Sequence, residues 1–205
     1  EVVTDLLIDD LAWMAAQWGP DGAARKSVMM DNGNVGLSTI FRGLGSLSYG
    51  EMAGERMKLG LLIHDPEEEH DCFSDNTDNS HYFDQLGIRN VYTGHFRRID
   101  GSIVSGPSVA DLVAEKDAAL DAEIRGKLDA TVAAMAAIRA RADSVEAYDQ
   151  MIGEGNAEGN AVVQAAIDGL IDQTRSIERA VAVLDRGTIA IEGSDSLDNP
   201  DAVFQ

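Results

Sequence analysis

Basic side chains are scarce in this sequence. Sixteen Lys and Arg residues stand against 36 Asp and Glu residues, which gives a formal charge of −20 at pH 7. A surface this negative repels phosphate backbones and anionic lipid headgroups, so it argues against nucleic-acid binding and against a membrane-surface role. Small cations and basic proteins are the partners that such a charge favours.

Cysteine and long apolar runs are also nearly absent. Cys72 is the only cysteine, so no disulfide can form within the chain and cysteine usage does not indicate a compartment. No apolar run approaches the roughly 20 residues that span a bilayer, and no signal peptide is visible. Because the sequence starts at Glu1 and enters an amphipathic pattern at once, we expect a processed product or a piece of a longer protein.

Apolar residues recur at helical spacing in four substantial segments, at about residues 2–18, 35–62, 108–138 and 160–184. Helices of this length with short to medium links predict an all-α fold, a helical bundle of about four long helices. The Asp100-Gly101 pair lies between β-forming residues and predicts a short β-hairpin. We expect the bundle lobe to cover residues 1–186 and an irregular, solvated tail to cover residues 187–205.

The spacing also predicts which residues form the core. Residues 2–18 should bury one face, on which Trp13 and Trp18 anchor the helix. A shorter helix is expected at about residues 79–86, where Gly87 would end it. The core positions of the two long carboxy-terminal helices are Val113, Leu120, Ile124, Leu128, Thr131, Met135 and Ile138, and then Val163, Ile167, Leu170, Thr174, Ile177, Val181 and Leu184.

Glycine is unusually frequent in the second segment, with seven glycines between Gly33 and Gly60. Each glycine inside a helix costs about 0.5–1 kcal/mol relative to alanine, so a compensating contact is expected. Ser46, Gly50 and Gly54 follow one another at steps of four and form a small-residue groove on one helix face. Tight helix packing is the favoured interpretation, and close approach of another backbone, a loop or a ligand is the alternative.

An acidic segment follows the glycine-rich helix. Eight carboxylates and three histidines lie between His64 and Asp84, with no Lys or Arg to neutralise them. Carboxylates and imidazoles together suit Zn, Mn or Fe, and Glu69, His70 and Asp71 are the candidate metal ligands. Phe73 should be buried and should draw its polar neighbours to the edge of the core. A structural hydrogen-bond network that pins a loop to the bundle is an equally weighted alternative.

Several catalytic and binding motifs are absent from the sequence. The Gly-rich run that starts at Gly43 ends in Ser48 and follows no strand, which excludes a dinucleotide loop. The calcium-loop pattern fails at Ser80 and Leu86. His64 and Glu67 have H-x-x-E spacing, but Pro66 between them makes the match accidental.

Five stretches resemble the imelysin-like family, in particular its iron-regulated bacterial branch: Gly43–Met57, Glu69–Thr77, Gly87–Tyr92, Gly106–Leu112 and Gly155–Asn160. They occur in order over nearly the whole chain. The resemblance implies an all-helical protein of two bundle-like lobes with a site between them. It also implies a periplasmic or outer-membrane-anchored cell-envelope protein involved in iron uptake, which contacts the membrane only through a lipid anchor outside this sequence.

The resemblance covers the carboxy-terminal half of the family, and the family's GxHxxE motif is missing here. We therefore expect the amino-terminal half of the same protein, as a second chain or an absent segment, to supply the His and Glu. The bound group would be iron or an iron-containing ligand, or zinc if the protein is an imelysin-type metallopeptidase. A structural or partner-binding bundle without metal is the third reading. The predicted ligand-binding residues are Glu55, Arg56, Ser74, Asp75, Asn76 and Thr77.

Overall fold

The structure is a computed structural model that describes residues 2–204. It forms two compact units, Glu1–Ile40 and Phe41–Gln205. The boundary between these units falls between residues 40 and 41, and the predicted division between residues 186 and 187 stays a prediction. The first unit contains the helices α1 (Val2–Ala16) and α2 (Ala23–Val28), the short 3-10 helix η1 (Asp31–Gly33), and the beginning of α3 (Asn34–Ser46).

The prediction that α1 buries one face is wrong. All of its residues are exposed, including Trp13 at 62%, and Trp18 just after it is 54% exposed. Apolar side chains occur on every side of this helix, as the consecutive Leu6, Leu7 and Ile8 show. An apolar face is buried only where another element covers it, and the short α2 does not cover this one.

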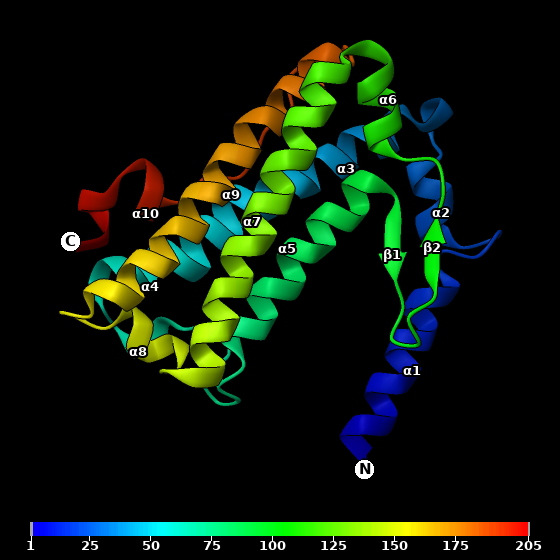
Figure 1. Ribbon diagram of the computed structural model, residues 1–205. Coiled ribbons are helices and arrows are strands. Elements are labelled where there is room, and N and C mark those ends of the chain that lie inside the picture. The colour runs from blue at the N-terminus through cyan, green and yellow to red at the C-terminus, as the bar shows by residue number, and fades with distance from the viewer. Residues whose placement is uncertain (1, 205) are drawn as a thin grey trace. The chain divides into compact units, whose positions relative to one another are not determined.

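The second unit holds the helical bundle (Figure 1). The helix that α3 begins continues through a π-helix, η2, and ends in α4, so residues 34–63 form one nearly continuous rod. The other helices and the hairpin of the bundle are α5 (Thr77–Thr93), β1 (His95–Arg97), β2 (Ile103–Ser105), α6 (Val109–Lys116), α7 (Ala118–Ser144), α8 (Tyr148–Ile152) and α9 (Ala157–Val183). The all-α fold with a short hairpin is confirmed.

Three short elements complete the chain: η3 (Pro66–Glu68), α10 (Asp195–Asp198) and η4 (Pro200–Phe204). In the helix of residues 34–63, η2 covers Leu47–Lys58 and α4 covers Leu59–Ile63. The π geometry of η2 was not foreseen, because apolar spacing alone does not separate a π-helix from an α-helix. Such segments are rare and occur frequently at functional sites.

The core lies where α9 packs against α7 and η2, and where α5 packs against α7 (Figure 1). Every predicted core position of the two long helices is buried. Their segments differ in detail, because Asp117 separates α6 from α7 and caps α7 by accepting hydrogen bonds from the Ala119 and Leu120 amides. The helix predicted at residues 79–86 runs instead through Gly87 to Gly94, which ends it in a left-handed conformation.

A layer of polar side chains crosses this core. Gln85 of α5 and Gln173 of α9 exchange hydrogen bonds of 2.8 and 2.9 Å, and Gln173 also donates to the Ser48 hydroxyl at 2.9 Å. All three side chains are buried. Because each buried amide has a partner, hydrogen bonds compensate for its desolvation, and the layer links η2, α5 and α9.

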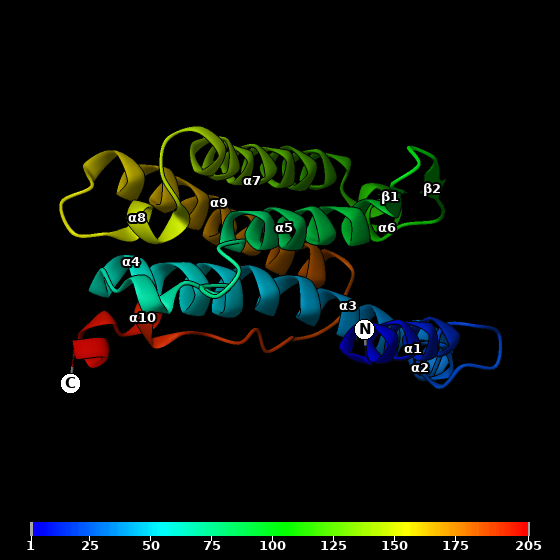
Figure 2. The same ribbon diagram turned by 90° about the horizontal axis from the view of Figure 1, so that it is seen from below.

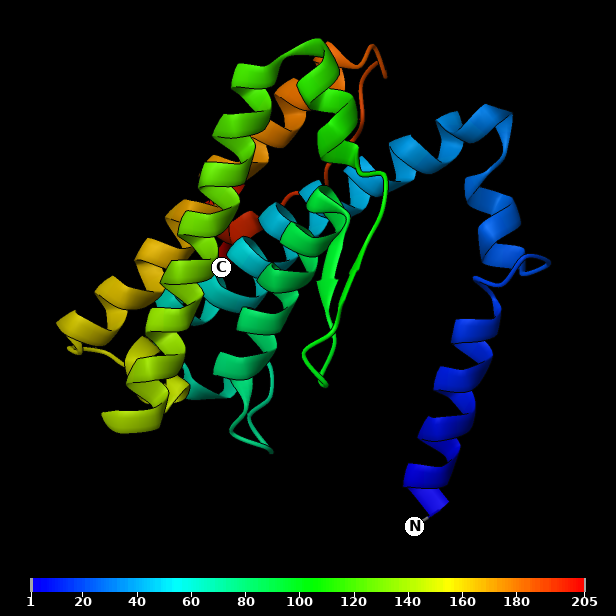
Figure 3. The ribbon, with the colours of Figure 1, turned by 45° about the vertical axis from the view of Figure 1, so that its right-hand side comes forward.

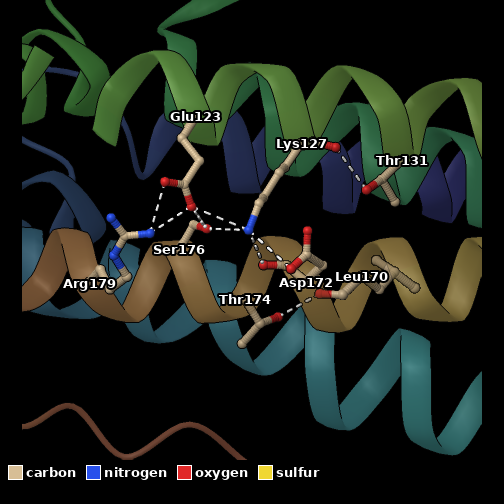
Figure 4. A network of polar contacts seen from close by, with 8 residues as sticks. All are labelled: Glu123, Lys127, Thr131, Leu170, Asp172, Thr174, Ser176 and Arg179. Atoms are coloured by element: carbon tan, nitrogen blue, oxygen red, sulfur yellow. Dashed lines mark hydrogen bonds and ion pairs between the residues drawn. The ribbon is translucent and has the colours of Figure 1, made fainter. Parts of the chain in front are cut away.

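A network of charges joins α7 and α9 at the surface (Figure 4). Lys127 of α7 lies 3.0 Å from an Asp172 carboxylate oxygen and donates to Ser176 at 2.9 Å. Arg179 donates to both oxygens of Glu123, at 2.7 and 2.8 Å. The Ser176 hydroxyl and the Arg179 guanidinium lower the pKa of the Glu123 carboxyl to about 2. These contacts hold the two longest helices side by side.

The hairpin leaves the bundle after α5 as a two-stranded ribbon (Figure 3). Phe96 pairs with Val104, and the Asp100 carboxylate accepts a hydrogen bond from the Ser102 amide in the turn. This confirms the predicted Asp-Gly hairpin, although both strands are exposed. Of the described helices, none is long and apolar enough to cross a bilayer.

The tail is ordered against the bundle, which corrects the expectation of a solvated tail. The segment between α9 and α10 runs along the helix that contains η2 (Figure 2). The Glu192 amide donates to Ser46 at 3.1 Å, and the Ser196 hydroxyl donates to the Gly54 carbonyl at 3.0 Å. A Cβ added at Gly54 would lie 2.3 Å from the Ser194 Cβ. The small-residue groove therefore receives the chain's own backbone.

Candidate functional site

Arg56, on the π-helix η2, is the centre of the candidate site. Its guanidinium lies 3.2 Å from the Glu51 carboxylate and 2.9 Å from the Asp84 carboxylate of α5. The Arg56 side chain is 23% exposed, so this bridge is partly shielded from water. Desolvation raises the pKa of the Asp84 carboxyl, and the guanidinium opposes that change.

The π geometry explains why Glu51 reaches Arg56. The two residues are five apart, and in a π-helix residues i and i+5 are joined by the backbone hydrogen bonds. In an α-helix the neighbours on one face are three or four apart, which would pair Glu51 with Glu55 instead. The wider turn therefore replaces a repulsive pair of carboxylates with an ion pair.

The acidic segment folds as a loop closed by hydrogen bonds between its own side chains. The Thr77 hydroxyl donates to Glu69 at 3.1 Å and accepts from the Asp71 amide at 3.0 Å. The Ser80 hydroxyl donates to the Asp71 carboxylate, and the Ser74 hydroxyl donates to the Asp71 carbonyl at 3.2 Å. Glu69 is buried at 7% exposure, and burial raises the pKa of its carboxyl.

His81 lies beneath this loop and is fully buried. Its ring stacks on His70 with centroids 6.3 Å apart and meets the Tyr148 ring edge-on at 5.3 Å. Neither ring nitrogen of His81 has a hydrogen-bond partner of acceptable geometry among the described residues, and the same is true of the Tyr148 hydroxyl. Burial lowers the pKa of His81 to about 3, and the neighbouring His70 and Arg56 act in the same direction.

Two hollows open beside Arg56 and His70, and these two side chains line both of them. The larger hollow, of about 660 Å³, also receives Asp71, Asn76 and Asp84. The smaller, of about 310 Å³, is lined by carboxylates: Glu51, Glu55, Glu67, Glu68 and Glu69. One guanidinium, one imidazole and several carboxylates thus meet solvent in one small region.

The structure brings some of the predicted site residues together and separates others. Glu55, Arg56, Glu69, His70, Asp71 and Asn76 all line these two hollows. Asp75 lines a different hollow, of about 150 Å³, next to Tyr148. Ser74 and Thr77 serve the loop through hydrogen bonds. His64, by contrast, binds the Ile152 carbonyl at 2.7 Å and forms no pair with Glu67.

One expectation for the acidic segment does not hold, and a second, the metal site, stays a prediction. Phe73 is 105% exposed, because the loop is held by its polar side chains rather than by an apolar anchor. Glu69, His70 and Asp71 are neighbours in sequence, yet no three His, Cys, Asp or Glu side chains within residues 2–204 are placed to hold one metal ion. Thr77 donates a hydrogen bond to the Glu69 carboxylate, and Ser80 donates one to the Asp71 carboxylate.

Sequence reasoning missed Glu51 as a partner of Arg56 and missed Asp84, Ser80 and His81 as members of the site. Asp84 lies 28 residues from Arg56, and only the packing of α5 beside η2 brings the two together. Ser80 and Asp84 are four residues apart, a spacing that places both on one face of α5. That spacing was the one available signal in the sequence.

The sequence profile of the imelysin family matches residues 1–177. Among curated proteins, none matches the sequence. The profile covers most of the 205 residues and includes both the π-helix η2 and the acidic segment. The chain belongs to the imelysin family.

Proposed function

We propose that this chain is the carboxy-terminal part of a cell-envelope protein that takes part in iron uptake. Iron, or an iron-containing ligand, is bound at the hollows beside Arg56 and His70. The amino-terminal half of the same protein supplies further ligands. Envelope location and iron uptake are extended to this chain from its resemblance to the iron-regulated branch of the family.

The observation that carries this proposal is the donor set around Arg56. Carboxylate oxygens and an imidazole nitrogen are ligands that iron accepts. His70 is exposed and stacks on His81, and it forms no hydrogen bond with another described residue, so its ring nitrogens are available to a ligand. Arg56 can bind the oxygen atoms of a chelator through its guanidinium. The net charge of −20 also raises the local concentration of cations.

An incomplete donor set in residues 2–204 is consistent with a shared site. Since no three metal-binding side chains converge in this part of the chain, the remaining ligands would come from the amino-terminal half or from a chelator. The two sources differ in what they predict. A shared site binds iron salts in the intact protein, whereas a chelate site binds ferric citrate but not free iron.

The proposal is tested by calorimetric titration of the intact parent protein with ferrous iron and with ferric citrate. Arg56→Gln and His70→Gln should each weaken binding at least about tenfold, equal to about 1.4 kcal/mol. Arg89→Gln is the matched control, because Arg89 also pairs with an aspartate of another helix, Asp129, away from the hollows. We expect its affinity to stay within about twofold of the wild type.

Binding that is unaffected by Arg56→Gln and His70→Gln would contradict the proposed site, and an intact protein that binds neither form of iron would contradict the proposed function. The imelysin-type peptidase is the other candidate. A catalytic zinc needs three protein ligands around one open position, and the amino-terminal half would have to supply part of that set as well. Casein hydrolysis that stops on addition of a chelator would support the peptidase instead.

A further inference from the structure

A separate cavity lies where the tail meets η2 and α9. Its volume is about 520 Å³, within the range of small-molecule sites, and its wall comes from η2, α9 and the segment around α10. None of its lining residues belongs to the hollows beside Arg56.

The tail that closes this cavity is fixed at several points. Ile191 lies over Gly45, where an added Cβ would come within 2.5 Å of its side chain. At the other end, the Tyr49 hydroxyl donates to Asp198 at 2.6 Å, and the Ser194 amide donates to the same carboxylate at 3.1 Å. The wall is therefore a packed part of the fold.

Some polar side chains of the cavity already form hydrogen bonds within the protein, and others are available to a ligand. Asp198 already accepts two hydrogen bonds, and the Thr174 hydroxyl donates to the Leu170 carbonyl at 2.8 Å. Arg175 and Glu178 also line the cavity, and both are exposed. Within the described chain, neither forms a hydrogen bond or an ion pair, although both lie one turn apart on α9.

Apolar side chains lie beside the charged groups of Arg175 and Glu178 in this cavity. The side chains of Ile171, Ile191 and Leu197 line the same cavity. A ligand with a single negative charge would meet the Glu178 carboxylate, and one with a single positive charge would meet the Arg175 guanidinium. A ligand that carries both charges next to an apolar group satisfies all three features.

We propose that this cavity binds a zwitterionic amino acid with an apolar side chain. The ligand carboxylate pairs with Arg175, the ligand ammonium pairs with Glu178, and its side chain packs against Ile171, Ile191 and Leu197. The binding is non-covalent and independent of the iron site, so either proposal can fail without the other.

L-Phenylalanine is the probe, titrated calorimetrically into the chain. Two analogues remove one charge each: 3-phenylpropanoate lacks the ammonium, and 2-phenylethylamine lacks the carboxylate. We expect both analogues to bind at least about tenfold more weakly than L-phenylalanine, because each leaves one charged side chain without its partner. An analogue that binds as tightly as L-phenylalanine, or an L-phenylalanine titration with no saturable heat, would overturn the proposal.

Variants assign the two charges. Arg175→Gln should weaken L-phenylalanine at least about tenfold and leave 2-phenylethylamine unchanged, whereas Glu178→Gln should weaken L-phenylalanine and leave 3-phenylpropanoate unchanged. Arg179→Gln is the matched control, since Arg179 lies on the same helix but pairs with Glu123. Circular dichroism checks that all three variants are folded. Equal effects of Arg175→Gln and Arg179→Gln would also overturn the assignment.

Discussion

At the scale of single residues, His81 combines full burial with two ring nitrogens that have no hydrogen bond of acceptable geometry within residues 2–204. The neutral ring packs on Tyr148 and His70, but a protonated ring would be a buried charge next to the Arg56 guanidinium. The Arg56 backbone and the Asp71 carboxylate favour protonation of His81, but burial outweighs both. The native state therefore excludes a proton that the unfolded chain accepts near pH 6.5.

This exclusion predicts acid sensitivity. As the pH falls below 6.5 towards the folded pKa of about 3, the unfolded state binds a proton that the native state does not, so the free energy of unfolding falls by up to about 1.4 kcal/mol per pH unit. His81→Phe should remove this component. Chemical denaturation between about pH 4 and 7 measures the slope.

His95→Phe is the control for this experiment, because His95 is exposed on the hairpin. Its pH slope should match that of the wild type. Glu69 and Asp84 have raised pKa values and act in the opposite direction, but they are present in every variant and cancel in the comparison. A His81→Phe slope equal to the wild-type slope would show that His81 does not titrate as described.

At the scale of elements, the tail packs against the π-helix η2. The glycine spacing in the sequence predicted a groove but left open what would occupy it. The tail occupies this groove: Gly50 faces the backbone of Glu192, and Gly54 faces the side chain of Ser194. No local pattern in residues 187–205 predicted this contact, because it depends on packing between segments about 140 residues apart.

Alanine substitutions at two helical glycines, Gly54 and Gly126, distinguish the effect of helix propensity from the effect of steric contact with the tail. Gly54→Ala should lower the free energy of unfolding by about 1–3 kcal/mol, because the new Cβ would lie 2.3 Å from Ser194. Gly126→Ala in α7 meets no atom within 4 Å and should raise it by about 0.5–1 kcal/mol. Chemical denaturation measures both values. A Gly54→Ala variant as stable as the wild type would mean that the tail is not held in the groove.

At the scale of the whole molecule, the two units differ in what they bury. All of the buried apolar core residues lie between Phe41 and Leu184, and the first unit leaves its large apolar side chains on α1 exposed. Sequence periodicity predicted the buried seams of α7 and α9 because those helices have partners within the chain. It failed for α1 because apolar spacing does not report whether another element covers the helix.

This difference predicts that the first unit contributes little to the stability of the second. Deletion of residues 1–33, which keeps α3 whole, should shift the midpoint of thermal unfolding by less than about 4 °C, the shift that about 1 kcal/mol causes in a domain of this size. Differential scanning calorimetry of the two chains provides the measurement. A larger fall would show that residues 1–33 support the bundle.

The fold class and the long core helices could thus be predicted from the sequence, whereas the site could be predicted only in part. The acidic segment was found because its carboxylates stand together in the chain, and Arg56 because it lies near the end of the glycine-rich helix that precedes them. The bridge to Asp84 and the burial of His81 were not, since both arise from contacts between α5 and other elements.

The two hydrogen bonds between Gln85 and Gln173 make the choice of residue at one position depend on the residue at the other. Loss of either amide alone leaves the side-chain oxygen of the other without its donor in the core, while simultaneous exchange of both for aliphatic residues removes the need for that donor. Natural variants of this bundle are therefore expected to change the two positions together, or to keep both.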